Sequence, residues 1–299
     1  MIQPPYLKRG DRIAIVAPGR AISFEEVHPS MKLFQKWGLE VILGSYVFNI
    51  ENQFAGSDAQ RQKDLQTMLD DVSIRAVICA RGGYGTVRII DKLDFTKFLR
   101  YPKWIVGYSD MTVLHSHIHR HFGVETLHAT MPVNMPENRL GATSVETLRK
   151  ALFGEEIIYA KRLGPHDRTG ASEGILAGGN LSILYSLMGS HSQIDTKGKI
   201  LFIEDLDEYL YHVDRMMMSL KRAGMLRDLK GVVVGSMQDM KDNTVPYGKT
   251  ANQIIYEAVK EYKYPVCFDF PAGHGPENVA MILGRRVKLI VDEEVALGF

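Results

Sequence analysis

The 299-residue sequence has only two cysteines, Cys79 and Cys267, and each stands alone in a strand-like stretch, "AVICA" and "PVCFDF". Neither belongs to a Cys-x-x-Cys pair or to a zinc-binding pattern, so the sequence indicates neither a disulfide framework nor a cysteine metal site. Two isolated thiols in apolar strands are typical of a reducing compartment. We therefore expect a cytoplasmic protein.

Long hydrophobic runs and an excess of one charge are also missing. No stretch of about 18 apolar residues occurs, so no transmembrane helix is predicted. The first residues become charged before any apolar run long enough for a signal peptide. Lysine and arginine total 36 against 35 aspartates and glutamates, a net charge of +1. Neither a nucleic acid nor a membrane surface is therefore expected as a partner.

The first half of the chain alternates short apolar runs with helical patterns. Apolar runs occupy residues 13–19, 39–44, 74–80 and 104–109, and helical patterns lie at 24–38, at 58–71 and from 110 onward. Continuous apolar strands separated by helices predict a parallel sheet that is covered on both faces. The expected fold class is therefore α/β, with a doubly wound architecture.

The second half predicts a smaller mixed sheet with helices. Residues 153–172 lose periodicity and gather glycine, proline and charges, which indicates a domain crossing. Strand patterns then return in "EGILAGG", "GKILFIEDL", "GVVVGS", "VCFDFP" and "VAMILGRRVKLIVD". We expect an N-terminal domain over residues 1–155, a linker over 156–171 and a C-terminal domain over 172–299.

The stretch "WIVGYSDMT", residues 104–112, places Ser109 where a buried strand joins a helix. A serine on such a turn lifts its hydroxyl above the sheet, and the following backbone N–H can point at an oxyanion. The five-residue nucleophile-elbow motif is incomplete, because Met111 stands where the second glycine belongs. A plain helix N-cap is therefore an alternative role for Ser109.

A second turn, "ARGGYGTVRIIDKLDF", follows the strand that ends near residue 80. The carboxyl ends of parallel strands face one crevice, so this glycine loop is expected beside Ser109, where it offers a backbone N–H. Its spacing matches neither the dinucleotide fingerprint nor the P-loop, and a purely structural turn is the alternative. No cofactor is predicted.

Two polar residues of the second half complete a candidate catalytic set. Glu204 follows the apolar run of "KILFIEDLDE", and a carboxylate at the end of a buried strand needs a partner. His274 lies between two glycines in "FDFPAGHGPEN", which suits a histidine that must be approached closely. Their alternative roles are helix capping and an unpartnered turn. Together with Ser109 they supply a nucleophile, an orienting acid and a base.

The segment "LHSHIHRHFG" forms a competing cluster of histidines at residues 115, 117, 119 and 121. On a helix, His115/His119 and His117/His121 are i,i+4 pairs on different faces. No glutamate stands between the members of either pair, and no third ligand is near, so we predict no metal site.

Six blocks of the sequence, in this order, resemble the serine LD-carboxypeptidase family. They are "PPYLKRGDRIAIVAPG", "ICARGGYGTVRIIDKLDF", "WIVGYSDMTVLH", "LAGGNLSIL", "LFIEDLDE…HVDRMMMSL" and "GHGPENVAMILG". The family includes murein tetrapeptide carboxypeptidases and the peptidases that give immunity to microcin C. The resemblance covers essentially the whole chain.

This resemblance implies both the fold and the roles of the site residues. The implied fold is a flavodoxin-like, class I glutamine amidotransferase-like N-terminal domain plus a smaller swivelling β/β/α C-terminal domain. Ser109 would be the nucleophile, Glu204 and His274 the remaining triad members, and the backbone N–H groups of Asp110 and Gly83 the oxyanion hole. The implied reaction removes the terminal D-alanine from a murein tetrapeptide during peptidoglycan recycling. A homodimer is also implied.

Four residues are further candidates for contacts with a muropeptide. An exopeptidase must recognise a free carboxylate, and Arg81 beside the glycine loop suits that contact, with a structural ion pair as its alternative. Tyr84, Asn180 and Glu173 are the others. The chain departs from many members in "LHATMP", where they read "HGP", so substrate details at His128–Thr130 are open.

Three other functions compete with murein cleavage. An amidase acting on a microcin C-type peptidyl-nucleotide uses the same family machinery, but this chain has no obvious long insertion between Glu204 and His274, which favours the murein branch. A non-catalytic muropeptide-binding protein is disfavoured, because all three triad positions are chemically competent. Glutamine amidotransfer needs a cysteine where Ser109 stands.

Overall fold

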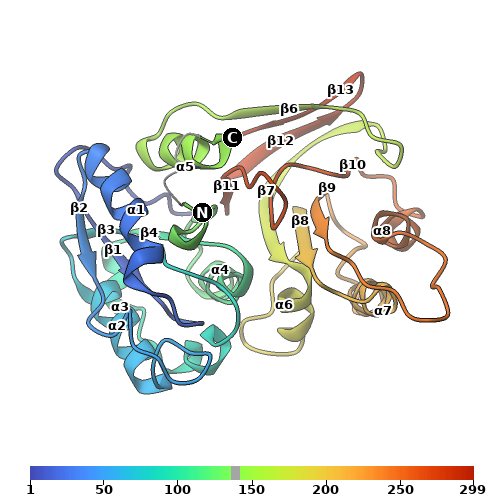
Figure 1. Cartoon of the computed structure of the whole chain (residues 1–299). Helices are drawn as coiled ribbons and strands as arrows, with labels where there is room; N and C mark the ends of the chain where they lie inside the picture. The colour runs from blue at the N-terminus through green and yellow to red at the C-terminus, as the bar shows by residue number, and fades with distance from the viewer. Residues whose placement is uncertain (136–141) are drawn as a thin grey trace.

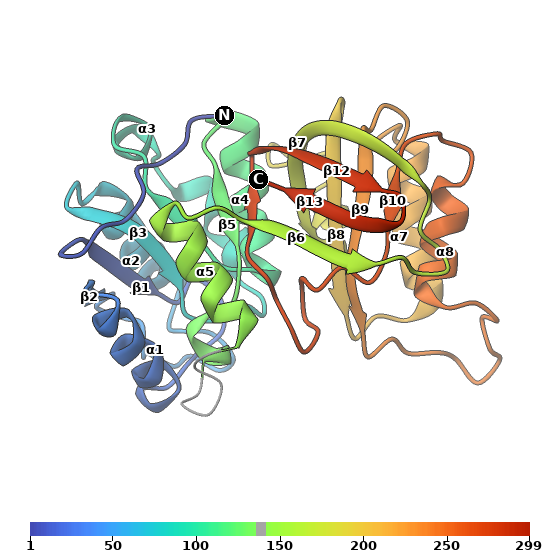
Figure 2. The same ribbon diagram turned by 90° about the horizontal axis from the view of Figure 1, so that it is seen from above.

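Two β-sheets lying side by side, each with its own helices, make up the structure (Figure 1). This computed structural model describes residues 1–135 and 142–299. Figure 2 shows the N-terminal half, in blue and green, next to the C-terminal half, in yellow to red. None of the helices in the described ranges has the length and apolar character needed to cross a bilayer.

The first sheet has the strand order β11-β5-β4-β3-β1-β2. Its parallel strands are β1 (Arg12–Val16), β2 (Glu40–Leu43), β3 (Ile74–Cys79), β4 (Trp104–Val106) and β5 (Thr126–His128). β11 (Met281–Leu283) adds an antiparallel edge strand beside β5. The predicted parallel α/β sheet is thus confirmed, apart from this last strand.

Helices cover both faces of the first sheet, as the continuous apolar strands predict. Ile13 and Ile15 pack with α1 (Phe24–Lys36) and α5 (Thr143–Phe153). Ala14 and Val16 point the other way, into a core with residues of α2 (Asp58–Asp70), α3 (Thr96–Arg100) and α4 (Thr112–His121). Short 3₁₀ turns connect these elements: η1 (Thr86–Arg88), η2 (Ile90–Lys92), η3 (Ser109–Met111) and η4 (Pro132–Asn134).

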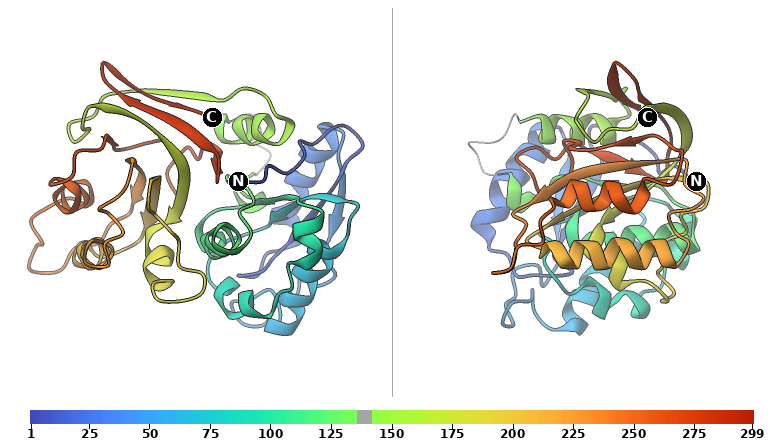
Figure 3. Two further views of the ribbon diagram at one scale, coloured as in Figure 1. Left: turned by 180° about the vertical axis from the view of Figure 1, so that it is seen from behind. Right: turned by 90° about the vertical axis from the view of Figure 1, so that its right-hand side faces the viewer.

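The second sheet is mixed, with the order β10-β9-β8-β7-β12-β13-β6. The parallel strands are β7 (Gly170–Asn180), β8 (Lys199–Leu206), β9 (Gly231–Gln238) and β10 (Val266–Cys267). The antiparallel strands are β12 (Arg286–Val291), β13 (Glu294–Gly298) and β6 (Ile158–Arg162). Three helices pack on one face: α6 (Leu181–Ser186), α7 (Leu210–Arg222) and α8 (Ala251–Val259). The right-hand view of Figure 3 shows α7 and α8, in orange, lying side by side.

The segment expected to be a linker, residues 156–171, contains β6 and so belongs to the second sheet. β6 pairs with β13 at the edge of that sheet, and its side chains alternate between partly buried and exposed. An edge strand with polar, exposed side chains carries little apolar periodicity, which is why the sequence indicated a loop there.

β11 joins the two halves of the molecule, although the sequence pattern assigns it to the C-terminal domain. Ile282 packs into the core of the first sheet, while Met281 and Leu283 pack into the core of the second. Successive side chains of β11 point to opposite faces, so the strand contributes to the cores of both sheets. The first sheet is completed by a segment from residues 281–283.

Candidate active site

Ser109 occupies a sharp backbone turn between β4 and α4. Its φ is +65°, in the left-handed region that residues other than glycine rarely adopt. Gly107 also has positive φ, and a methyl group there would lie 2.6 Å from Cγ of Met111. Among the described residues no side chain caps η3 or α4, and Met111 occupies the N-cap position of α4. The N-cap alternative for Ser109 is therefore not what the structure has.

The glycine loop after β3 passes directly over Ser109. A methyl group on Gly82 would come within 2.8 Å of Cβ and 3.0 Å of Oγ of Ser109. The loop is fastened by the buried carboxylate of Asp110, whose Oδ2 accepts hydrogen bonds from the Thr86 amide (2.9 Å) and hydroxyl (2.7 Å). Burial raises the pKa of Asp110, and the Thr86 bonds oppose this. Gly82 and Ser109 are thus held close together, and Gly83 and Asp110 are the residues that follow them in the sequence.

Glu204 and His274 form a hydrogen-bonded pair. Nδ1 of His274 lies 2.6 Å from Oε2 of Glu204, whose side chain is fully buried, while the histidine side chain is 11% exposed. Two glycines allow this approach: a Cβ on Gly273 would lie 2.6 Å from Oε2 of Glu204, and one on Gly235 would lie 3.1 Å from Cβ of Glu204 and collide with the Ala272 carbonyl oxygen. A carboxylate that engages one ring nitrogen sets the orientation of the imidazole.

His274 lies beside the turn that carries Ser109. Its ring centroid is 4.7 Å from that of Tyr108, the residue preceding Ser109. Both side chains line a cavity of about 180 Å³. The other lining residues come from three segments, 130–134, 142–145 and 273–278: Thr130, Asn134, Ala142, Ser144, Val145, Gly273, Gly275, Pro276 and Asn278. Thr130, in the segment where the sequence departs from "HGP", is therefore part of this wall.

Arg81 and Tyr84, two of the candidate substrate contacts, lie on the glycine loop itself. The Arg81 guanidinium is 3.4 Å from Oε1 of Glu26 and from the Ala21 carbonyl, and its side chain is 29% exposed. Tyr84 is exposed, with its ring 6.1 Å from that of Phe54. Both side chains are accessible from solvent, on the loop whose Gly82 contacts Ser109.

The other two candidates have different surroundings. Asn180 is buried and caps α6, since its Oδ1 accepts from the Ile183 amide while its Nδ2 donates to Asp205. Its backbone N–H donates to Oγ1 of Thr112 at 2.9 Å, which ties β7 to the start of α4. Glu173 is exposed near the opposite end of β7, paired in register with Lys288. These contacts give Asn180 a structural role, while Glu173 lies exposed near the far end of the strand.

The four histidines of α4 lie on two faces of the helix: the rings of His117 and His121 are 4.5 Å apart, while His115 and His119 are buried with separate partners. Nε2 of His115 lies 2.9 Å from the Gly107 carbonyl oxygen, and Nε2 of His119 lies 3.0 Å from Oγ1 of Thr126. Burial lowers the pKa of His115 to about 4 and that of His119 to about 3. Across residues 1–135 and 142–299 no three histidine, cysteine or acidic side chains are grouped so as to hold a metal ion.

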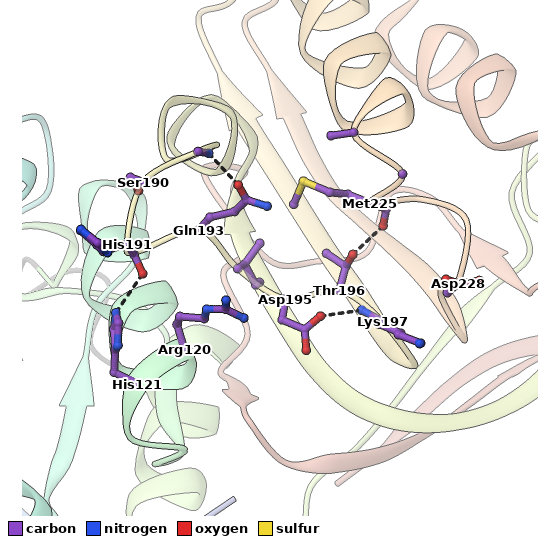
Figure 4. A pocket seen from close by; sticks show the side chains of 14 residues that line it. Arg120, His121, Ser190, His191, Gln193, Asp195, Thr196, Lys197, Met225 and Asp228 are labelled. Atoms are coloured by element: carbon purple, nitrogen blue, oxygen red, sulfur yellow. Dashed lines mark hydrogen bonds between the residues drawn. The ribbon is translucent and has the colours of Figure 1, made fainter.

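A larger cavity, of about 450 Å³, lies at the far end of α4 (Figure 4). Arg120 and His121 face it from α4, and the segments at 189–197 and 223–228 form the opposite wall. None of Ser109, Glu204 and His274 lines this cavity. The larger cavity is therefore distinct from the one that Tyr108 and His274 line.

Comparison with known proteins identifies the family. The LD-carboxypeptidase N-terminal domain matches residues 13–129, and the LD-carboxypeptidase C-terminal domain matches residues 173–289. A Bacillus subtilis protein named "Probable murein peptide carboxypeptidase" is 35% identical over 99% of this chain and 93% of its own length. The chain belongs to the LD-carboxypeptidase family. It is an enzyme of the carboxypeptidase class.

Two solved structures show how far this LD-carboxypeptidase fold extends. The muramoyltetrapeptide carboxypeptidase from Oxalobacter formigenes superposes with a TM-score of 0.87 at 28% identity, covering 96% of this chain and 98% of that one. The microcin C7 self-immunity protein MccF, solved with aspartyl sulfamoyl adenosine, has the same TM-score at 20% identity, over 100% and 99% of the two chains. The second likeness concerns the fold alone.

Sequence reasoning missed the residues that hold the site together. Thr86 supports the glycine loop, and Ser236 and Asn278 bond the amides on either side of His274. The available signal was that small polar residues stand close to the predicted glycines in "YGTV" and "GHGPEN". Such residues are common in loops, so their partners become visible only in three dimensions.

Proposed function

We propose that this enzyme is a serine LD-carboxypeptidase that hydrolyses the terminal D-alanine from a murein tetrapeptide. The observation that carries the proposal is the 2.6 Å pair of Glu204 and His274 beside the strained turn at Ser109. The names of the Bacillus relative and the Oxalobacter structure support the substrate class. Action in the cytoplasm during peptidoglycan recycling, as a homodimer, belongs to the same proposal.

The reaction begins when the Ser109 hydroxyl attacks the carbonyl carbon of the last peptide bond. His274 takes the hydroxyl proton on Nε2 as the new C–O bond forms, because Nδ1 is engaged with Glu204. The buried carboxylate keeps the ring in this tautomer and stabilises the imidazolium. The proton then passes to the departing amine, and the C–N bond breaks to leave an acyl-enzyme and free D-alanine.

Water completes the cycle through the same groups. His274 removes a proton from a water molecule that attacks the acyl carbon, and Oγ of Ser109 leaves with that proton. In both halves of the reaction the negative charge on the carbonyl oxygen is received by the N–H groups of Asp110 and Gly83. Each such donor contributes about 3 kcal/mol to the barrier reduction.

Recognition of the free carboxylate is proposed for Arg81. Its guanidinium makes two contacts at the outer limit of hydrogen bonding, 3.4 Å each, and it is partly exposed on the loop that covers Ser109. A cation held so loosely remains able to turn toward a carboxylate. Tyr84, exposed on the same loop, supplies an accessible ring for the substrate side chain.

The test compares two substrate classes on one preparation. We expect release of D-alanine from a murein tetrapeptide, detected by mass spectrometry, and loss of that release in Ser109→Ala and His274→Ala. A peptidyl-nucleotide of the microcin C type is the second substrate, since the MccF fold is shared. Cleavage of the peptidyl-nucleotide alone would transfer the assignment to that alternative. Binding of the tetrapeptide with no cleavage of either substrate would identify a muropeptide-binding protein.

A further inference from the structure

The loop that carries His274 is held at the backbone on both sides of the histidine. The amide of Gly273 donates to Oδ1 of Asn278 at 2.9 Å, and the amide of Gly275 donates to Oγ of Ser236 at 2.9 Å. The amide of Ser236 in turn donates to the Ala272 carbonyl at 3.0 Å. The position of the imidazole therefore depends on two side chains besides Glu204.

Of these two residues, Asn278 connects the loop to the half of the molecule that carries Ser109. Its own amide donates to Oγ of Ser144 on α5 at 2.8 Å, and both residues are buried. Two residues later, the amide of Ala280 donates to Oγ1 of Thr147, also on α5, at 3.0 Å. The chain then enters β11, which pairs with β5 of the first sheet. Ser236, by contrast, lies on β9 of the second sheet.

The side chain of Asn278 lines the cavity next to His274 and is 6% exposed. Its Oδ1 accepts the hydrogen bond from the Gly273 amide. Its side chain also interacts with the buried His128 and opposes the lowering of that residue's pKa by burial. The amide side chain of Asn278 thus contacts the loop that carries His274, the cavity beside that loop and the buried His128.

We propose that Asn278 is a positioning residue that fixes the distance of His274 from Ser109. Its side chain holds the Gly273 amide, and its backbone is anchored to Ser144 of α5. The inference rests on the proposed function, because it assumes that His274 serves Ser109 as the base. An asparagine suits this position because its side-chain carbonyl accepts from the amide of Gly273, five residues earlier, while its own backbone amide donates to Ser144 on α5. Glu204 fixes the tilt of the ring, and Asn278 fixes where the ring stands relative to the nucleophile.

The experiment uses the full chain and compares Asn278→Leu with Thr147→Val. Leucine keeps the branched shape of asparagine, although its methyl groups are bulkier, and removes the acceptor. Valine at 147 removes the neighbouring tie between α5 and Ala280 without touching the histidine loop. We expect N278L to lower kcat for tetrapeptide cleavage about 10²-fold with KM changed less than about twofold, as a displaced catalytic group does. T147V lowers the melting temperature and keeps kcat near the wild-type value.

A second measurement separates this inference from the proposed function. The rate at which a fluorophosphonate labels Ser109 depends on His274 and requires no peptide substrate. We expect N278L to slow labelling in the same proportion as kcat, and T147V to leave it unchanged. Wild-type labelling without tetrapeptide cleavage would reject the proposed substrate while leaving the role of Asn278 open to this test.

Two results would overturn the role of Asn278. One is wild-type kcat and labelling in N278L. The other is an equal loss of both in N278L and T147V, which would mean that docking of α5 matters and the Gly273 bond does not. If N278L does not fold, Asn278→Ala replaces it, because the smaller side chain also removes the acceptor and is read by the same two rates.

Discussion

Gly82 and Ser109 are in van der Waals contact, and the contact leaves no room for a methyl group on the glycine. An added Cβ would lie 2.8 Å from Cβ and 3.0 Å from Oγ of the serine, closer than side chains approach each other. The identity of the residue at position 82 thus controls where the proposed nucleophile points. Glycines in loops near active sites are usually explained by backbone conformation, but at position 82 the lack of space next to Ser109 is what requires a glycine.

Replacing Gly82 with alanine is expected to lower kcat/KM at least tenfold. The added methyl group would overlap the Ser109 side chain and must displace it, and misplacing a reacting group is costly. The measurement is tetrapeptide cleavage with the thermal melt as a check on folding. Gly164→Ala is the matched control, since its nearest atom would be 3.7 Å away and no change is expected. Equal activity in both variants would contradict the contact.

Replacing Ser109 separates activity from strain. Both Ser109→Ala and Ser109→Gly lack the nucleophile and should be inactive. Only glycine adopts a φ of +65° without strain, so the free energy of unfolding of S109G should be about 1 kcal/mol higher than that of S109A. Chemical denaturation of both variants checks this difference. An S109G protein that is less stable than S109A would show that the turn carries no strain.

Glu204→Gln is expected to lower kcat about 10⁴-fold, because an amide in place of the carboxylate favours the wrong tautomer of His274 and removes the counter-charge. The chain contains a matched control at the start of α7, where Glu208 and His212 are also 2.6 Å apart but partly exposed. Glu208→Gln alters the same kind of pair and should retain full activity. The assay is tetrapeptide cleavage at neutral pH, and similar losses in both variants would refute the specific role of Glu204.

Acid should destabilise the fold through the buried histidines of α4. A histidine whose folded pKa is lowered contributes stability that is present above its unfolded pKa of about 6.5 and is lost as the pH falls. For His115 and His119 the loss runs from about 6.5 down to about 4 and 3, at about 1.4 kcal/mol per pH unit for each group. The pKa of Asp205 is raised to about 7 by burial and by Glu204, so the contribution of Asp205 to stability increases as the pH falls and opposes that of the histidines.

The contribution of the two buried histidines to acid sensitivity is obtained by comparing the wild type with variants that lack them. Denaturant unfolding between pH 4 and 7 should show a shallower pH dependence in the His115→Gln, His119→Gln double variant than in the wild type. His121→Gln, at an exposed position on the same helix, should follow the wild-type curve. Coincident curves for all three proteins would show that the buried histidines do not titrate with folding.

The sequence predicted the parts of the molecule that local pattern controls. The apolar runs around Ile13, Val77 and Ile105 became neighbouring parallel strands, and the helices between them cover both faces. Each run is continuous because both of its faces are buried, and this property is visible residue by residue.

Sheet membership was beyond the reach of the pattern. "VAMILGRRVKLIVD" indicates strands, but β11 and β12 within it join different sheets, because pairing depends on partners far away in the chain. The left-handed φ of Ser109 is equally invisible in "GYSD", since a serine gives no local sign of that conformation. The Glu204–His274 pair could be suggested from residue types, while its 2.6 Å separation needed the fold.

The placement of β11 has a consequence for how the protein comes into being. A ribosome delivers the chain from the N-terminus, so the sheet bearing Ser109 waits for residues 281–283 before its last strand is in place. The proposed base, His274, arrives just before them. A nascent chain that has not yet delivered residues 274–283 therefore lacks both the proposed base and the antiparallel edge strand of the first sheet.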